Sequence, residues 1–464
     1  MDIIRAKVEI FVCIGTGFVF SLVLLYLMSA FAETIAWVCI FLTGIGLFGG
    51  SVLCWFMRSD VTAERGAPGS GAAFQSNDLN DSETEAFWLL VGAIALAALG
   101  CCFCVCVVCG LKHVKEAINV IDAAADFTVE NKRVIIVPVV YFVFTITSFV
   151  IWLYAFACVV SLNKVTACTG LACVPQDRDI HWTSAWTACA LAMFFGILWI
   201  MAWWNYTSQF VVMAAATTYY FNCTEENEYN GSAELCYSVK LAHIYHTGSI
   251  ACGAFIIALI EFIKFVFLYL AKKAEKASGG NKLIKAVVCV AECCLACIEK
   301  VCDYINQSAF AYIAVTGDGF CKGAWEGFLL NVKHMLDFTF ANYIAKIFIL
   351  LGKISVVVVN GFTLTFIMKD ISGSADKMNP WGPIGVSCLL TYMIASLFLG
   401  IFENAVLALM TCYSVDVDLN GKDGEEGGKW GPRTFHDTIA RVGKTGDAVD
   451  EESGDDEKKG NEVK

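Results

Sequence analysis

Eight apolar stretches constrain the fold of this chain more than any other feature of its sequence. A helix needs about 20 residues to cross the roughly 30 Å of hydrocarbon in a bilayer. Stretches of that length lie at about 8–29, 34–57, 86–110, 134–162, 182–221, 243–270, 339–367 and 382–412. The sequence is 58% hydrophobic and only 16% charged, a balance that soluble domains rarely have. We therefore predict an all-α, polytopic transmembrane helical bundle.

Basic residues near the spans predict the orientation of the chain, because cytosolic loops are enriched in Lys and Arg. The amphipathic connector at 111–133 contains four of them, Lys112, Lys115, Lys132 and Arg133. We therefore place this connector in the cytosol, and the polar loop at 58–85 and the N-terminus outside the cell. The acidic, Gly-rich tail at 413–464 is predicted to be disordered and cytosolic. These two ends require an odd number of crossings, so we expect about nine.

Two segments could supply the ninth crossing. The stretch at 182–221 would measure about 60 Å as one helix, far more than a bilayer needs, so the first alternative divides it near residues 203–205. The second alternative is a further crossing between 283 and 335, inside the amphipathic, Cys-rich segment at 271–338. A division near residue 203 would keep the basic part of that segment, 271–300, in the cytosol. The sequence leaves both alternatives open.

Several motifs occur in a characteristic order along the chain. One is the span from Trp199 to Phe221, with a glutamine at Gln209 and an aromatic pair at its end. The others are "YHTGSIACGAF" (245–255), a Cys-rich region ending in "GDGFCKGAWEGF" (293–328), "LLGKISVV" (350–357) and "YMIASLFLGIFENAVLALMTCYSVDVD" (392–418). In order and spacing, this set resembles the choline transporter-like family over roughly 90–420.

The chain departs from the family pattern at three points, one of which is that the usual Asn-Asp-Gly after the last span is loosened to "NGKDG" (420–424). It begins about where the second span of the family would begin, without the family's first span and large extracellular domain. An aspartate often found in the last span of the family falls at Leu407. A family with ten spans would leave nine here, in agreement with the expected number of crossings.

The resemblance implies that choline is the substrate, with ethanolamine left open. A quaternary ammonium group cannot donate a hydrogen bond, but aromatic faces bind it through cation–π contacts. Trp199, Trp203, Tyr206 and Phe210 are spaced to share one helix face, beside Gln209. We predict substrate binding for Trp199, Trp203, Tyr206 and Gln209. The alternative is an aromatic belt at the membrane interface and, for Gln209, a hydrogen bond between helices.

Ionisable residues inside predicted spans are further candidates, because such residues are usually functional. Glu403 is the candidate counter-charge for a cation, or a proton carrier; Tyr392, near the start of the same span, is a further candidate for substrate binding. Glu261 and Lys264 could take part in coupling or gating, or could pair with each other at i and i+3. Lys353 is a further candidate for coupling or gating, and its alternatives are to snorkel to the membrane interface or to pair with Glu403.

His246 begins the segment "HTGS" and is a candidate for proton coupling, because histidine titrates near neutral pH. Its alternative role is a local hydrogen bond. Cys168 and Cys173, in a predicted extracellular loop, could form a disulfide. The other cysteines lack the His partners of a zinc site, so we expect no metal, and no motif indicates a cofactor.

The function that we expect is transport of choline or a related organic cation by a multi-span solute carrier. The alternatives are a non-transporting membrane scaffold of the same fold and a membrane-bound lipid enzyme, for which no catalytic motif is visible. The expected partners are the small cation and the lipid bilayer, not nucleic acid. The plasma membrane is implied by the resemblance, and the coupling ion, direction and oligomeric state stay open.

Overall fold

The computed structural model contains eight helices, within its described residues, that are long and apolar enough to cross a membrane. It describes residues 6–66, 76–109, 111–162, 164–167, 178–181, 183–277, 282–333, 335–371, 381–420 and 429–433. The prediction of an all-α transmembrane bundle is confirmed, and its expected number of about nine spans is close. Each of the eight helices coincides with one of the apolar stretches in the sequence.

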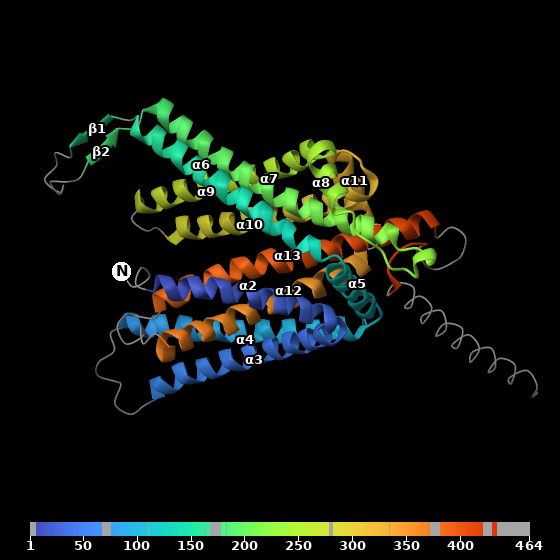
Figure 1. The fold of residues 1–464 in the computed structure, drawn as a ribbon. Coiled ribbons are helices and arrows are strands. Elements are labelled where there is room, and N and C mark those ends of the chain that lie inside the picture. The colour runs from blue at the N-terminus through green and yellow to red at the C-terminus, as the bar shows by residue number, and fades with distance from the viewer. Residues whose placement is uncertain are drawn as a thin grey trace, which may run out of the picture. The chain divides into compact units, whose positions relative to one another are not determined.

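The chain divides into two compact units. The first unit comprises Met1–Ala125 and Leu336–Ala395, and the second comprises Asp126–Met335 and Ser396–Lys464. The helices that contribute to the first unit (Figure 1) are α2 (Lys7–Ala30), α3 (Ala32–Gly66), α4 (Ser76–Cys109), most of α5 (Leu111–Glu130), α12 (Met335–Phe366) with its terminal π-turn (Ile367–Ile371), and the beginning of α13 (Trp381–Asn420).

Asn360 joins three helices inside the first unit. Its buried side chain accepts a hydrogen bond from Thr16 Oγ1 at 2.7 Å. Its amide nitrogen donates to the Cys13 carbonyl at 2.9 Å and to Thr391 Oγ1 at 2.6 Å. Polar side chains often connect helices in this way where no water is present. Asn360 therefore links α2, α12 and α13.

The second unit is a bundle of longer and shorter helices (Figure 1). Its helices are the 3-10 turn η2 (Lys132–Ile135), α6 (Ile136–Ser161), α7 (Ser184–Asn222), the 3-10 turn η3 (Glu225–Asn227), α8 (Leu235–Lys240), the π-turn η4 (Leu241–Tyr245), α9 (Thr247–Ala277), α10 (Lys282–Thr316), α11 (Phe320–Lys333) and the remainder of α13. Two short antiparallel strands, β1 (Lys164–Ala167) and β2 (Arg178–His181), pair between α6 and α7. We call the end of the unit that carries these strands the hairpin end, and the opposite end the α8 end.

Helix α7 is continuous over all 39 of its residues. No proline lies within it. At the division predicted near residues 203–205, the hydroxyl of Thr207 donates to the Trp203 carbonyl. The Trp204 indole donates to Ser148 on α6 at 3.0 Å, so the neighbouring helix supports the same turn. The structure therefore excludes a division of 182–221 as the source of a ninth crossing.

Helix α10 lies in the other region considered for a ninth crossing. It is antiparallel to α9, because Asn306 on α10 bonds the Gly253 carbonyl while Glu299, earlier on α10, bonds Lys264, later on α9. It also lies along α7, where Asp303 accepts a hydrogen bond from Tyr206. The C-terminal end of α9 therefore lies at the hairpin end of the second unit, with the start of α7 (Figure 1).

Candidate functional site

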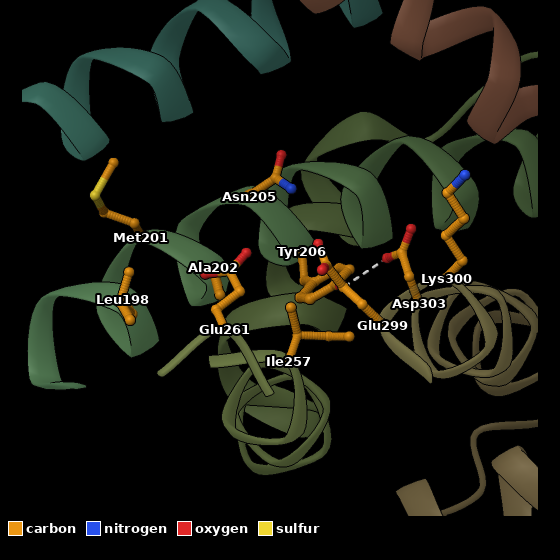
Figure 2. A pocket seen from close by; sticks show the side chains of 10 residues that line it. All are labelled: Leu198, Met201, Ala202, Asn205, Tyr206, Ile257, Glu261, Glu299, Lys300 and Asp303. Atoms are coloured by element: carbon orange, nitrogen blue, oxygen red, sulfur yellow. Dashed lines mark hydrogen bonds between the residues drawn. The ribbon is translucent and has the colours of Figure 1, made fainter. Parts of the chain in front are cut away.

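A cavity of about 390 Å³ lies near the middle of α7, α9 and α10 in the second unit. Figure 2 shows its polar side chains: Asn205 and Tyr206 on α7, Glu261 on α9, and Glu299, Lys300 and Asp303 on α10. Leu198, Met201, Ala202 and Ile257 form its apolar wall. The lining residues of each helix recur at spacings of three and four, so each helix presents one face to the cavity.

The carboxylate of Asp303 is held from two sides. Tyr206 donates a hydrogen bond from its hydroxyl to Asp303 Oδ1 at 2.6 Å (Figure 2). Gln307 donates from its amide nitrogen to Oδ2 at 3.0 Å. Hydrogen bonds to an ionised carboxylate are shorter and stronger than neutral ones. The orientation of Asp303 is therefore fixed before any ligand binds.

Glu299 is paired across the helices. Its Oε2 lies 2.7 Å from the ammonium nitrogen of Lys264 on α9, and both side chains are about one third exposed. Among the described residues, Lys264 thus forms its ion pair with Glu299 on α10 rather than with Glu261, three residues before it on α9. With all groups ionised, Glu261, Glu299, Asp303, Lys264 and Lys300 carry a net charge of −1. This balance suits a single monovalent cation.

The aromatic residues predicted to share one face of α7 contact different neighbours in the structure. Trp199 donates from its indole to the Ala251 carbonyl at 3.0 Å and is 37% exposed. The ring of Trp203 lies 4.6 Å from that of Trp204, and Phe210 packs against Phe310. Among the described residues, Tyr206 is the member of this stripe that lines the cavity, and Glu261 is the other predicted site residue that does so.

Two predicted site residues carry a buried polar atom that has no hydrogen-bond partner in the part of the chain that the structure describes. These atoms are the indole nitrogen of Trp203 and Oε1 of Gln209. Leaving such a group unpaired costs about 1–3 kcal/mol. Gln209 follows Asn205 by four residues, so it lies on the helix face that lines the cavity, one turn further along. Its free oxygen is available to a donor at that level of α7.

The other candidates lie elsewhere. Lys353 and Tyr392 belong to the first unit, where the Lys353 ammonium nitrogen lies 6.0 Å from the centre of the Tyr392 ring. Glu403 belongs to the second unit and is partly exposed on α13. Cys168 and Cys173 fall outside the described residues, so their disulfide stays a prediction.

His246 is a buried histidine at the start of α9, at the α8 end. It is 7% exposed, and its ring lies 5.6 Å from that of Phe210. Burial lowers its pKa, because an apolar contact disfavours the charged imidazolium. His243, one turn earlier, lies 2.8 Å from the Tyr141 hydroxyl, and burial lowers its pKa as well.

We expect the protein to lose thermal stability as the pH falls below about 6.5, the ordinary pKa of histidine. The pKa of His246 is lower in the folded state, so the unfolded state binds more protons in this range and is favoured by acid. The measurement is the melting temperature between about pH 7.5 and pH 5.5. His246→Gln should show a shallower decline than the wild type, with the remaining slope from His243 and other groups. Equal slopes would contradict the assignment.

Comparisons with known proteins connect this site to one family. A model of the family described as plasma-membrane choline transporter matches residues 94–418. That range is well over half of the chain and contains the whole lining of the cavity. The chain therefore belongs to this family, and it is a multi-pass membrane protein of the plasma membrane.

Curated relatives agree with the family model. Choline transporter-like protein 1 of Mus musculus is 24% identical over 414 residues, which cover 88% of this chain and 60% of the relative. The protein of that name from Torpedo marmorata is 25% identical over 421 residues, with the same coverage of 88% and 60%. Choline transporter-like protein 4 of Bos taurus is 25% identical over 465 residues, which cover 90% of this chain and 64% of the relative. The chain thus spans less than two thirds of the length of these relatives.

Proposed function

We propose that this chain carries choline, or a closely related small organic cation, across the plasma membrane and binds it in the cavity between α7, α9 and α10. The observation that carries the proposal is the group of three carboxylates at the cavity, Glu261 on the membrane helix α9 and Glu299 and Asp303 on α10, which two lysines among the described residues balance only in part. Charged groups inside a membrane span, such as Glu261, are rare and usually mark the path of an ion or a substrate. Family membership supports choline as the substrate.

Each polar residue has a proposed role. Asp303 supplies the counter-charge for the ammonium group, oriented by Tyr206 and Gln307. The ring of Tyr206 offers an aromatic face to the methyl groups, a contact worth about 0.5–2 kcal/mol. Glu261 adds negative charge from α9. Gln209, whose oxygen has no partner among the described residues, accepts a hydrogen bond from the hydroxyl of choline.

The size of the cavity also suits the proposal. Its volume of about 390 Å³ falls within the range of small-molecule sites. Ethanolamine, a protonated primary amine, would bind the same carboxylates by donating hydrogen bonds. Trp199 and Trp203, just outside the lining, would act on the entry path rather than on the bound cation. This transport requires no covalent step and no cofactor.

Uptake into proteoliposomes tests the proposal. The purified full chain should take up radiolabelled choline in a saturable manner, and an excess of unlabelled choline should suppress the signal. Ethanolamine added as a competitor reports whether both cations use one site. Uptake no greater than that of empty liposomes would refute transport and favour a non-transporting scaffold of the same fold.

A further inference from the structure

A short segment that follows α13 docks at the α8 end of the second unit. The backbone nitrogen of Trp430 in this segment, residues 429–433, donates to Asp416 Oδ2 at 3.0 Å. The Tyr220 hydroxyl on α7 donates to the same oxygen at 3.1 Å, and Asn420 donates to the other oxygen at 2.6 Å. Asp416 has no exposed surface. One buried carboxylate therefore joins α7, α13 and the segment.

Packing makes this contact specific for the sequence Trp-Gly. The ring of Trp430 meets that of Phe221 at 5.7 Å in an edge-on arrangement. Gly431 has φ of +110°, a conformation that L side chains rarely adopt, and an added Cβ would come within 2.7 Å of the Tyr220 ring. A side chain at position 431 would therefore push the segment away from α7.

The last turn of α7 is fixed by several segments at once. Tyr219 packs against Phe127 at the end of α5, at 5.4 Å. Its neighbours Tyr220 and Phe221 contact Asp416 and the docked segment. The same helix lines the cation cavity four turns earlier with Asn205 and Tyr206. Helix α7 therefore connects the docked segment with the cavity.

We propose that residues 429–433 form an intramolecular latch, which holds the α8 end of the second unit closed while docked on Tyr220, Phe221 and Asp416. Release of the latch removes one donor from the buried carboxylate and frees the end of α7 from α13. The α8 end then opens towards the cavity. This role in gating rests on the proposed function, because a transporter must open each end in turn.

Limited proteolysis tests docking without reference to transport. Trypsin cleaves after lysine, and the bond between Lys429 and Trp430 lies within the latch. In the full-length protein, Gly431→Ala should increase cleavage at this bond by about tenfold, because proteolysis follows local opening. Gly319→Ala is the matched control, since an added Cβ there meets no atom within 4 Å. Equal cleavage in the wild type and Gly431→Ala would overturn the latch.

Alkylation and uptake test gating. An Asn205→Cys reporter in the cavity, quantified by mass spectrometry after maleimide treatment in nanodiscs, should react several-fold faster when combined with Gly431→Ala. The initial rate of choline uptake should rise by a similar factor in Gly431→Ala alone. If Gly431→Ala increases cleavage after Lys429 but leaves alkylation and uptake unchanged, the gating role is overturned. Faster cleavage and alkylation without choline uptake in any variant would support the latch and refute choline transport instead.

Discussion

Replacing Asp303 by Asn should weaken choline binding by about tenfold to a hundredfold, equivalent to about 1.4–2.8 kcal/mol. The substitution keeps the size of the side chain, and the Tyr206 hydroxyl can still donate to its remaining oxygen. The negative charge is lost, so the cavity becomes neutral overall and no longer offsets the charge of the cation. Two opposite unit charges about 4 Å apart attract each other by up to about 4 kcal/mol near a protein surface. The expected loss of binding free energy lies below this limit. The measurement is the Kd of radiolabelled choline for the purified protein.

Two further variants make this prediction specific. Asp318→Asn removes a carboxylate that pairs with Lys322 outside the cavity, at i and i+4, and should leave the Kd unchanged. Tyr206→Phe keeps the aromatic ring but removes one hydrogen bond to Asp303, so its effect should be smaller than that of Asp303→Asn. A wild-type Kd for Asp303→Asn, in protein of normal melting temperature, would refute the assigned counter-charge.

Replacing Gly253 by Ala should lower both the thermal stability and the uptake of choline. An added Cβ on Gly253 would approach the ring of Phe310 to 2.6 Å and that of Phe320 to 3.1 Å. Phe310 is fully buried and packs against Tyr206, so it has little room to move. Overpacking of this kind costs about 1–3 kcal/mol. Separation of α9 from α10 would also move Glu261 away from Asp303.

Gly248→Ala is the matched control for this prediction. It lies on the same helix, and an added Cβ there meets no atom within 4 Å. Its melting temperature should equal or exceed that of the wild type, because alanine favours the helix more than glycine does. Its uptake should equal that of the wild type. Equal effects of the two substitutions would show that the contact with Phe310 does not matter.

The helices of this fold were predictable because their signal is local. A run of apolar residues of sufficient length identifies a membrane helix without knowledge of its neighbours. The limits of α7 and α9 in the structure lie within a few residues of the predicted spans, apart from the longer C-terminal end of α9. The end of α13 was placed too early, because the acidic tail lowers the average hydropathy before the helix stops at Asn420.

Helix α10 carries half of the polar residues in the cavity, and its role was not predictable from the same signal. Its carboxylates Glu299 and Asp303 lower its hydropathy, so it reads as an amphipathic segment rather than a span. Their spacing of four residues places them on one helix face. This spacing indicates a shared face. It does not indicate a site, because the residues that pair with these carboxylates, Tyr206 and Lys264, lie on other helices.

The continuity of α7 and the division of its aromatic stripe have a common cause. Sequence spacing shows that Trp199, Trp203 and Tyr206 share a face, but not which neighbour each residue meets. In the structure Trp199 donates a hydrogen bond to α9, and Tyr206 donates one to α10. Likewise, the length of 182–221 favours two helices. The hydrogen bond from Trp204 to Ser148 on α6 instead supports one continuous helix at the predicted division. Such features depend on packing between distant segments.

The position of bound choline tests the central claim most directly. An experimental structure determined in the presence of choline should show density for the cation between Tyr206, Glu261 and Asp303, with its hydroxyl towards Gln209. The same experiment with Asp303→Asn should show that density weakened or absent. Choline bound at another place, such as beside Glu403 on α13, would contradict the account of this cavity.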